Sequence, residues 1–110
     1  MSAVVAERQL DFYGADGVHP GYVRVEVPTP DQNDWRCNYE LEWPGFQQRH
    51  HTMGVDSYQA LLLALQTVPT MIAVSPDFKA GRIGAFGEKI KTRRKLKEVF
   101  GVMRLPGFDP

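Results

Sequence analysis

The residue types that most often bind metal ions or perform catalysis are few in this chain. Its histidines are His19, His50 and His51, and Cys37 is its single cysteine. His50 and His51 are neighbours in a strand-like segment, so their side chains would point to opposite faces and cannot easily bind one ion. A zinc site wants three or four ligands. We therefore expect no bound metal and no cofactor.

No serine or cysteine stands in the setting of a catalytic nucleophile. The serines are Ser2, Ser57 and Ser75, and the sequence contains no Gly-x-Ser-x-Gly elbow. Cys37 alternates with aromatic residues, which favours a buried cysteine that packs as a small apolar side chain. A single cysteine cannot form an internal disulfide, so the sequence leaves the redox compartment open.

Glu40 and Glu42 are the carboxylates best placed for acid–base chemistry. They share the polar face of one strand-like segment with Arg36. Together with His50 they would form an acid–base set, but a cross-strand ion pair with Arg24 explains the two carboxylates equally well. We rank an enzyme behind two binding functions and expect that the protein is not an enzyme.

Positive charge gathers near the C-terminal end of the chain. Residues 1–78 have a net charge of −6 and residues 79–110 a net charge of +6. Either the basic part docks on the acidic part of the same chain or of a second subunit, or it contacts a polyanion. The residues predicted to contact an anionic partner are Arg82, Lys89, Lys91, Arg93, Arg94, Lys95 and Lys97.

The elements that would position these residues begin with strands. Residues 4–12 alternate apolar and polar side chains, with Arg8 as an exception on the apolar face, and residues 22–27 alternate well. Residues 28–33 contain two prolines and predict a loop. Residues 46–53 predict a further strand on weaker alternation.

Residues 35–43 give the clearest strand. One face would be apolar and would pack against the rest of the core, and the other would be polar. This pattern is typical of an antiparallel sheet that is covered on one face only. The apolar face consists of Trp35, Cys37, Tyr39, Leu41 and Trp43.

The strongest helix signal begins at Asp56. Asp56 at the N-cap and Gln59 three residues later form a capping box. Pro69 costs a helical hydrogen bond, so we expect the helix to kink or stop near it. Leu63 lies on the otherwise polar stripe, so we expect the C-terminal segment or a second subunit to cover it. The apolar stripe contains Tyr58, Leu61, Leu62, Leu65 and Val68.

The C-terminal part predicts a second, basic helix over residues 88–100 that ends at Gly101. Its helical spacing would put Lys91, Arg94 and Lys95 on one face. Three glycines within residues 81–87 fit either a flexible loop or a short hairpin. The last residues, 105–110, are expected to be extended.

Two stretches of the chain resemble a family of small bacterial proteins of unknown function. Residues 34–41 read Asp-Trp-Arg-Cys-Asn-Tyr-Glu-Leu, and residues 54–65 contain Gly-x-Asp-Ser-x-Gln-Ala-Leu. The resemblance covers roughly residues 5–72 and implies an antiparallel sheet followed by one long helix. It implies no activity, cofactor or functional residue. The chain departs from the pattern at Pro69 and from Lys79 onward.

The sequence favours a cytoplasmic protein without a membrane partner. The N-terminal residues lack the basic and apolar regions of a signal peptide. The apolar stretch over residues 58–74 is interrupted by polar side chains and is expected to be too short and too polar to span a bilayer.

Taken together, the patterns predict a two-layer α+β protein. A four-stranded antiparallel meander would pack against one long helix, so that residues 1–78 form the core and residues 79–110 a basic extension of the same domain. The expected function is binding of another protein, as an immunity or accessory protein does, with a homodimer through the Leu63 face as one form. The alternative is a nucleic-acid-binding accessory protein that uses residues 82–97.

Overall fold

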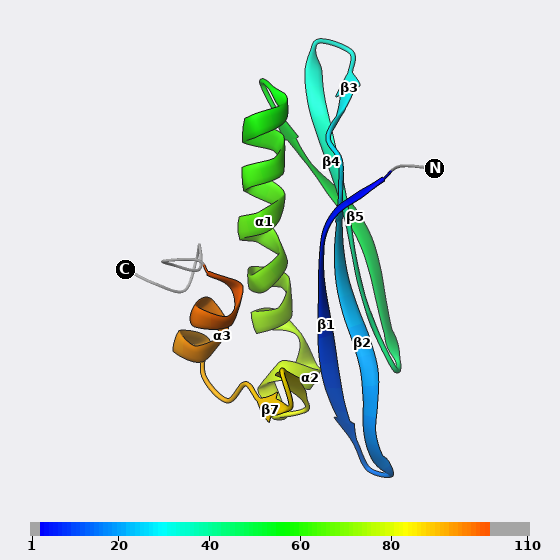
Figure 1. Ribbon diagram of the computed structural model, residues 1–110, viewed down its shortest axis with the longest axis vertical. Helices are drawn as coiled ribbons and strands as arrows, with labels where there is room; N and C mark the ends of the chain where they lie inside the picture. The colour runs from blue at the N-terminus through cyan, green and yellow to red at the C-terminus, as the bar shows by residue number, and fades with distance from the viewer. Residues whose placement is uncertain (1–2, 102–110) are drawn as a thin grey trace.

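The computed structural model describes residues 3–101, which fold into an α+β structure with one antiparallel sheet and three helices (Figure 1). The predicted fold class is therefore confirmed. In chain order the elements are β1 (Val4–Gly14), β2 (Gly17–Glu26), β3 (Thr29–Asp31), β4 (Asp34–Trp43), β5 (Phe46–Gly54), α1 (Ser57–Val74), α2 (Pro76–Lys79), β6 (Ile83–Ala85), β7 (Glu88–Lys89) and α3 (Arg93–Phe100).

The sheet differs in detail from the predicted four-stranded meander. Within the described residues it has seven strands in the order β3-β4-β2-β1-β6-β7, and β5 pairs with β4. Because β5 pairs along β4 from Trp35 to Trp43, β2 and β3 share the other edge of β4. They are separated at Pro28, which has no backbone N–H to donate. The predicted loop over residues 28–33 is thus a short strand and a two-residue turn.

The core lies between the sheet and α1, as the alternation in β4 predicts. Cys37, Tyr39, Leu41 and Trp43 are buried, whereas Trp35 at the end of the row is partly buried. Val23 and Val25 of β2 are also buried, but α1 packs mainly on β4 and β5. The apolar face of residues 35–43 is therefore covered, and it forms part of the core.

Helix α1 begins where the capping box predicts. Asp56 Oδ1 accepts a hydrogen bond of 2.8 Å from the backbone N–H of Gln59, and Gln59 Oε1 accepts one of 2.8 Å from the backbone N–H of Val55. Gly54 permits this close entry, since a Cβ there would lie 2.4 Å from the backbone N of Ala60. Such a contact excludes any side chain at position 54.

The helix does not stop at Pro69 but continues to Val74, and Pro69 itself is buried. A proline with a buried ring gains packing that offsets the missing backbone hydrogen bond. Leu63 is 37% exposed in the described structure, so the expected covering of Leu63 by a second subunit stays a prediction.

By length and composition alone α1 could cross a membrane, which the polar interruptions of residues 58–74 did not lead us to expect. Helices of soluble cores pass the same test. In this structure α1 lies along the sheet (Figure 1), with Ala60 and Ala64 fully buried against it.

The C-terminal part is built into the fold through short elements that the sequence pattern did not resolve. Ile83 of β6 pairs with Phe12 of β1, and Ile90 N–H donates to Ile83 O at 2.9 Å. This pairing keeps residues 88–90 extended, so the predicted helix over 88–100 begins only at Arg93, after the Thr92 cap. The helix ends at Gly101 as expected, with φ of 69°. Of the three glycines within residues 81–87, Gly84 and Gly87 belong to a hairpin, whereas Gly81 lies in the turn after α2.

Helix α2 was not predicted. It begins at Pro76, and Ser75 Oγ accepts a hydrogen bond of 3.2 Å from the backbone N–H of Phe78. The Trp43 indole donates a hydrogen bond of 2.8 Å to Asp77, which ties α2 to the end of β4. Helix α3 packs beside the C-terminal half of α1 (Figure 1). The expected extended segment over 105–110 lies outside the described residues.

Candidate functional site

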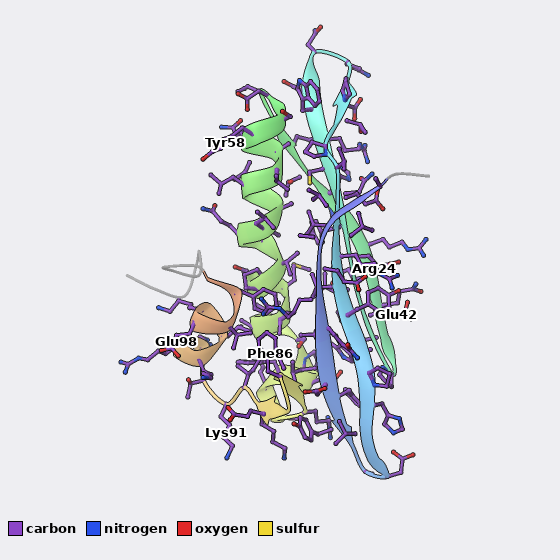
Figure 2. The ribbon with its side chains drawn as sticks, in the orientation of Figure 1. Arg24, Glu42, Tyr58, Phe86, Lys91 and Glu98 are labelled. Atoms are coloured by element: carbon purple, nitrogen blue, oxygen red, sulfur yellow. The ribbon has the colours of Figure 1, made fainter. Side chains whose placement is uncertain are left out.

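The carboxylates predicted for acid–base work lie in a polar network on the sheet face opposite α1. Tyr22 Oη lies 3.0 Å from an oxygen of Glu40 and 3.0 Å from one of Glu42, so two acceptors share its single proton. Glu40 also pairs with Arg49. The predicted ion pair with Arg24 is wrong, because Arg24 pairs with Glu7 instead. Figure 2 shows Arg24 and Glu42 projecting from this open face.

The network fixes the protonation of its members. Burial and the two nearby carboxylates raise the pKa of Tyr22 to about 12. Burial pushes the pKa of Glu40 upward, but hydrogen bonds from Arg49 and Tyr22 outweigh it and hold this pKa below its usual value. Glu40 is therefore an ionised acceptor at neutral pH and is poorly suited to donate a proton.

The three histidines do not form one cluster: the rings of His50 and His51 lie 5.2 Å apart, but His19 is elsewhere. His19 lies 2.8 Å from Asp16 near the β1–β2 turn, whereas His50 stacks on Tyr39 with ring centroids 6.2 Å apart. Burial and the neighbouring Arg36 lower the pKa of His51. Among residues 3–101, no group of three or more His, Cys, Asp or Glu side chains is arranged to hold a metal ion.

Cys37 is buried, as predicted. Its Sγ donates a hydrogen bond of 3.3 Å to the backbone carbonyl of Glu26. Burial, and to a lesser extent the charge of Glu26, raises the pKa of the Cys37 thiol, so the reactive thiolate is disfavoured at neutral pH.

The seven residues predicted to contact an anion are spread over the β6–β7 hairpin and α3. Arg82 pairs with Asp77 at 3.3 Å, and the Lys89 ammonium lies 5.1 Å from the centre of the Tyr13 ring. The prediction that Lys91 shares a helical face with Arg94 and Lys95 is wrong, because Lys91 precedes α3. The remaining members, in α3, are Arg93, Arg94, Lys95 and Lys97.

Phe86 stands out at the tip of this hairpin. It is 76% exposed and has a φ of 56°, a left-handed conformation that bulky residues rarely adopt. Phe86 and Gly87 form the two-residue connection between Ala85 and Glu88, a place where Asn-Gly is the usual choice. Figure 2 shows Phe86 in the same part of the molecule as Lys91.

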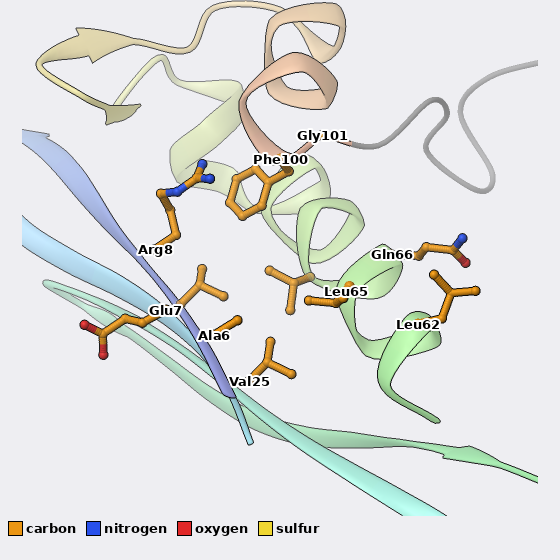
Figure 3. Close-up of a pocket in the computed structure, with 11 residues that line it drawn as sticks. Ala6, Glu7, Arg8, Val25, Leu62, Leu65, Gln66, Phe100 and Gly101 are labelled. Carbon is orange, nitrogen blue, oxygen red and sulfur yellow. The ribbon is translucent and has the colours of Figure 1, made fainter. Parts of the chain in front are cut away.

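Sequence reasoning missed one apolar cavity. It lies between the N-terminal half of β1, α1 and the end of α3, and has a volume of about 520 Å³ (Figure 3). Phe100 and Gly101 form its α3 end. We call it the β1–α1 groove. Its apolar lining comes from Ala6, Val23, Val25, Leu62, Leu65 and Val68.

The groove runs beside an open edge of the sheet. In the described structure β6 pairs with β1 only at Asp11 and Phe12. The backbone N–H of Tyr13 donates to Arg82 O on that side, at 2.8 Å. Backbone groups alternate in direction along a strand, so those of Gln9 and Glu7 point toward the same edge. Beyond the β6 contact they are available to another strand.

Arg8 sets the α3 end of the groove. Its Nη1 donates a hydrogen bond of 2.7 Å to Val99 O in the last turn of α3. Its guanidinium also lies 4.9 Å from the centre of the Phe86 ring and 5.0 Å from that of Phe100. A cation at a helix C-terminus and between aromatic rings is favourable. The apolar alternation of β1 thus breaks at Arg8 because this side chain holds α3 in place.

Comparison with known proteins identifies one family. The family described as Domain of unknown function (DUF6968) matches residues 6–94. The match spans most of the described structure, from β1 to the start of α3, and agrees with the resemblance to a family of unknown function. No curated protein and no solved structure matches the chain.

Proposed function

The chain belongs to the DUF6968 family, and we propose that it is a non-enzymatic domain that binds another protein. The partner contributes an extended segment with apolar side chains, which adds to the open edge of β1 and packs over the β1–α1 groove. The observation that carries this proposal is the coincidence of an open strand edge and an apolar groove along the same part of β1.

The open edge of β1 and the β1–α1 groove suit the addition of a strand from a partner. The backbone of an added strand would pair with the outward groups of Glu7 and Gln9, and every second side chain would enter the groove. Leu62 and Leu65 are 41% and 39% exposed, so they offer apolar surface that a partner can bury. A stripe of this kind on a surface marks an interaction site more often than an isolated leucine does.

The polar face of the sheet supports a binding function over an enzymatic one. Glu40 and Glu42 are engaged by Tyr22 and Arg49, and the lowered pKa of Glu40 argues against a role as a general acid. His50 hydrogen-bonds within its own strand rather than to either carboxylate. These side chains stabilise the pairing of β2, β4 and β5.

The proposal is tested by selecting short random peptides, displayed on phage, on the full chain. We expect enrichment of peptides with apolar residues at alternate positions. Leu65→Lys should weaken their binding at least tenfold, because an ammonium group would replace the apolar contact. Isothermal titration calorimetry with the selected peptides measures the change.

Val74→Lys is the matched control. Val74 lies on the same helix, away from the groove, and is 44% exposed. It should leave peptide binding unchanged. Failure to enrich any peptide, or equal binding to the Leu65→Lys and Val74→Lys variants, would count against the groove as the binding site.

A second candidate function is binding of a single-stranded nucleic acid through residues 82–97. It is favoured by Phe86, an exposed aromatic residue in a strained conformation beside the basic segment. The first turn of α3 contains Arg93, Arg94 and Lys95 and no acidic residue. Cations at a helix N-terminus oppose the helix dipole, so a cluster of three at this end is unfavourable for α3 by itself, although Lys95 also pairs with Glu98 at 3.9 Å.

A further inference from the structure

We propose that two copies of this chain form a homodimer through the first half of α1. The contact surface consists of Tyr58, Leu62 and Leu65, which we call the outer α1 face. The inference goes beyond the proposed function, because it requires no other protein. Three observations support it: the shape of the helix layer, the lack of charged side chains on α1, and the apolar area that the outer α1 face exposes.

The outer side of α1 is covered over only half of its length. Pro69 and Ala73, in the half beside α3, are buried. Tyr58, Leu62 and Leu65 continue the same side at helical spacing, but they are 75%, 41% and 39% exposed. Figure 2 shows Tyr58 on the side of α1 away from the sheet. The helix layer therefore has a step at the end of α3.

A step of this shape is complementary to itself. A twofold axis perpendicular to α1 and close to Leu62 would place the exposed halves of two α1 helices against each other in opposite directions. Each α1 would then begin where the α3 of the other copy ends, at Phe100 and Gly101, which border Leu62 and Leu65 (Figure 3). The start of α1 is the positive end of its dipole and the end of α3 the negative one, so these two ends attract.

Helix α1 has no charged side chain from Ser57 to Val74. Side chains near a twofold axis approach their own copies, so a charged residue there would meet a like charge. A partner of a different kind imposes no such restriction, and charged side chains around the contact would help to select it. The uncharged helix therefore favours a second copy as the occupant of the outer α1 face.

The exposed area suits a reversible dimer. Val55, which is 73% exposed, and the exposed Gln59 adjoin the outer α1 face. Together with the three residues of the face they expose roughly 500 Å² per copy, so two copies would bury about 1,000 Å², the lower limit for a specific interface. Such an interface is typical of a dimer that forms at micromolar concentrations.

Sedimentation equilibrium of the full chain tests the dimer. Between about 1 and 500 µM the weight-average mass should rise from that of one chain toward that of two. Leu62→Lys should raise the dissociation constant at least tenfold, because two ammonium groups would meet across the axis. Leu62→Glu should do the same, since two carboxylates would meet there.

A mixture of these two variants tests the symmetry of the contact. Leu62→Lys mixed with Leu62→Glu should dimerise more tightly than either variant alone, because opposite charges now meet at the axis. Recovery of the dimer also shows that both variants fold. A mixture that is as monomeric as each variant by itself overturns the arrangement around Leu62.

Leu63→Lys is the matched control. Leu63 is 37% exposed, but it lies about 100° around the helix from Leu62 and therefore outside the outer α1 face. It should leave the dissociation constant unchanged. A parent chain that stays monomeric at the highest concentration overturns the inference. Dissociation by Leu63→Lys alone, or by both lysine variants equally, overturns it as well.

The dimer and the proposed partner would share Leu62 and Leu65, because both leucines also line the β1–α1 groove. A peptide selected on the groove should therefore dissociate the dimer, and a peptide that binds the intact dimer overturns this shared use. Failure to select any peptide refutes the proposed function and leaves the dimer in place. A monomeric chain that binds selected peptides refutes the dimer alone.

Discussion

At the scale of single residues, Arg8 and Phe86 depart from the usual pattern of their positions. Arg8 interrupts the apolar face of β1, yet its charge is met by Val99 O and by the rings of Phe86 and Phe100. Phe86 keeps a left-handed backbone and stays 76% exposed, and the described contact of its ring is with Arg8. Strain of this kind is a reason to look for a ligand at the hairpin tip.

The Asp56 cap provides a test at this scale. Asp56→Ala removes the acceptor for the Gln59 N–H and should lower the free energy of unfolding by about 1 kcal/mol. Asp56→Asn, which retains a side-chain oxygen, should cost much less. Urea denaturation of the three proteins measures the difference, and equal stability of the alanine variant and the parent would contradict the capping role.

At the scale of elements, what could be predicted depended on how local each signal is. The alternation over residues 35–43 and the cap at Asp56 are local, so β4 and the start of α1 follow from sequence. The extended conformation of residues 88–90 depends on Ile83, and that of residue 83 on Phe12, far away in the chain. A pattern-based prediction extends the basic helix through this segment because its partners are not local.

The candidate site was missed for the same reason. The β1–α1 groove is formed by four separate parts of the chain, at residues 6–8, 23–25, 62–68 and 100–101. Each part has an ordinary apolar pattern. The groove exists because α1 packs on β4 and β5 and leaves part of β1 uncovered. The local sign of it in the sequence is Arg8, a charged residue on the otherwise apolar face of β1.

The docking of α3 depends on Arg8, which gives a test at the element scale. Arg8→Met should remove about 2 kcal/mol from the free energy of opening of α3, because a charge-assisted hydrogen bond and two ring contacts are lost. Amide hydrogen exchange should then become about 30-fold faster in α3, while β4 remains protected.

Arg24→Met is the control for this experiment. Arg24 also lies over a ring, 3.8 Å from the centre of Tyr22, but on the opposite face of the sheet. It should leave exchange in α3 unchanged. If both variants, or neither of them, accelerate exchange in α3, Arg8 does not anchor the helix.

At the scale of the whole molecule, charge is distributed unevenly along a chain whose net charge is zero. The described ion pairs satisfy part of the basic segment, as between Arg82 and Asp77 and between Lys95 and Glu98. The first pair joins the basic part to Asp77 of the acidic part, and the second lies within the basic part. The second candidate function predicts that the basic segment also contacts an anionic partner.

Titration of a labelled single-stranded RNA at about 50 and 200 mM salt tests this second function. Phosphate contacts should give a steep loss of affinity with salt, and Arg94→Ala should reduce the slope by about one unit. Phe86→Ala should weaken binding by about 1–3 kcal/mol without changing the slope, as expected for a lost stacking contact. Undetectable binding at the lower salt would eliminate the candidate.

The sheet has a second open edge, since β5 pairs only with β4 among the described strands. The two edges differ, so joining β1 of one copy to β5 of the next would not close on itself. Each added copy would present a fresh edge, and growth would continue as an open filament. Arg49 is exposed on β5 and pairs with Glu40, and a charged side chain on an edge strand opposes such growth.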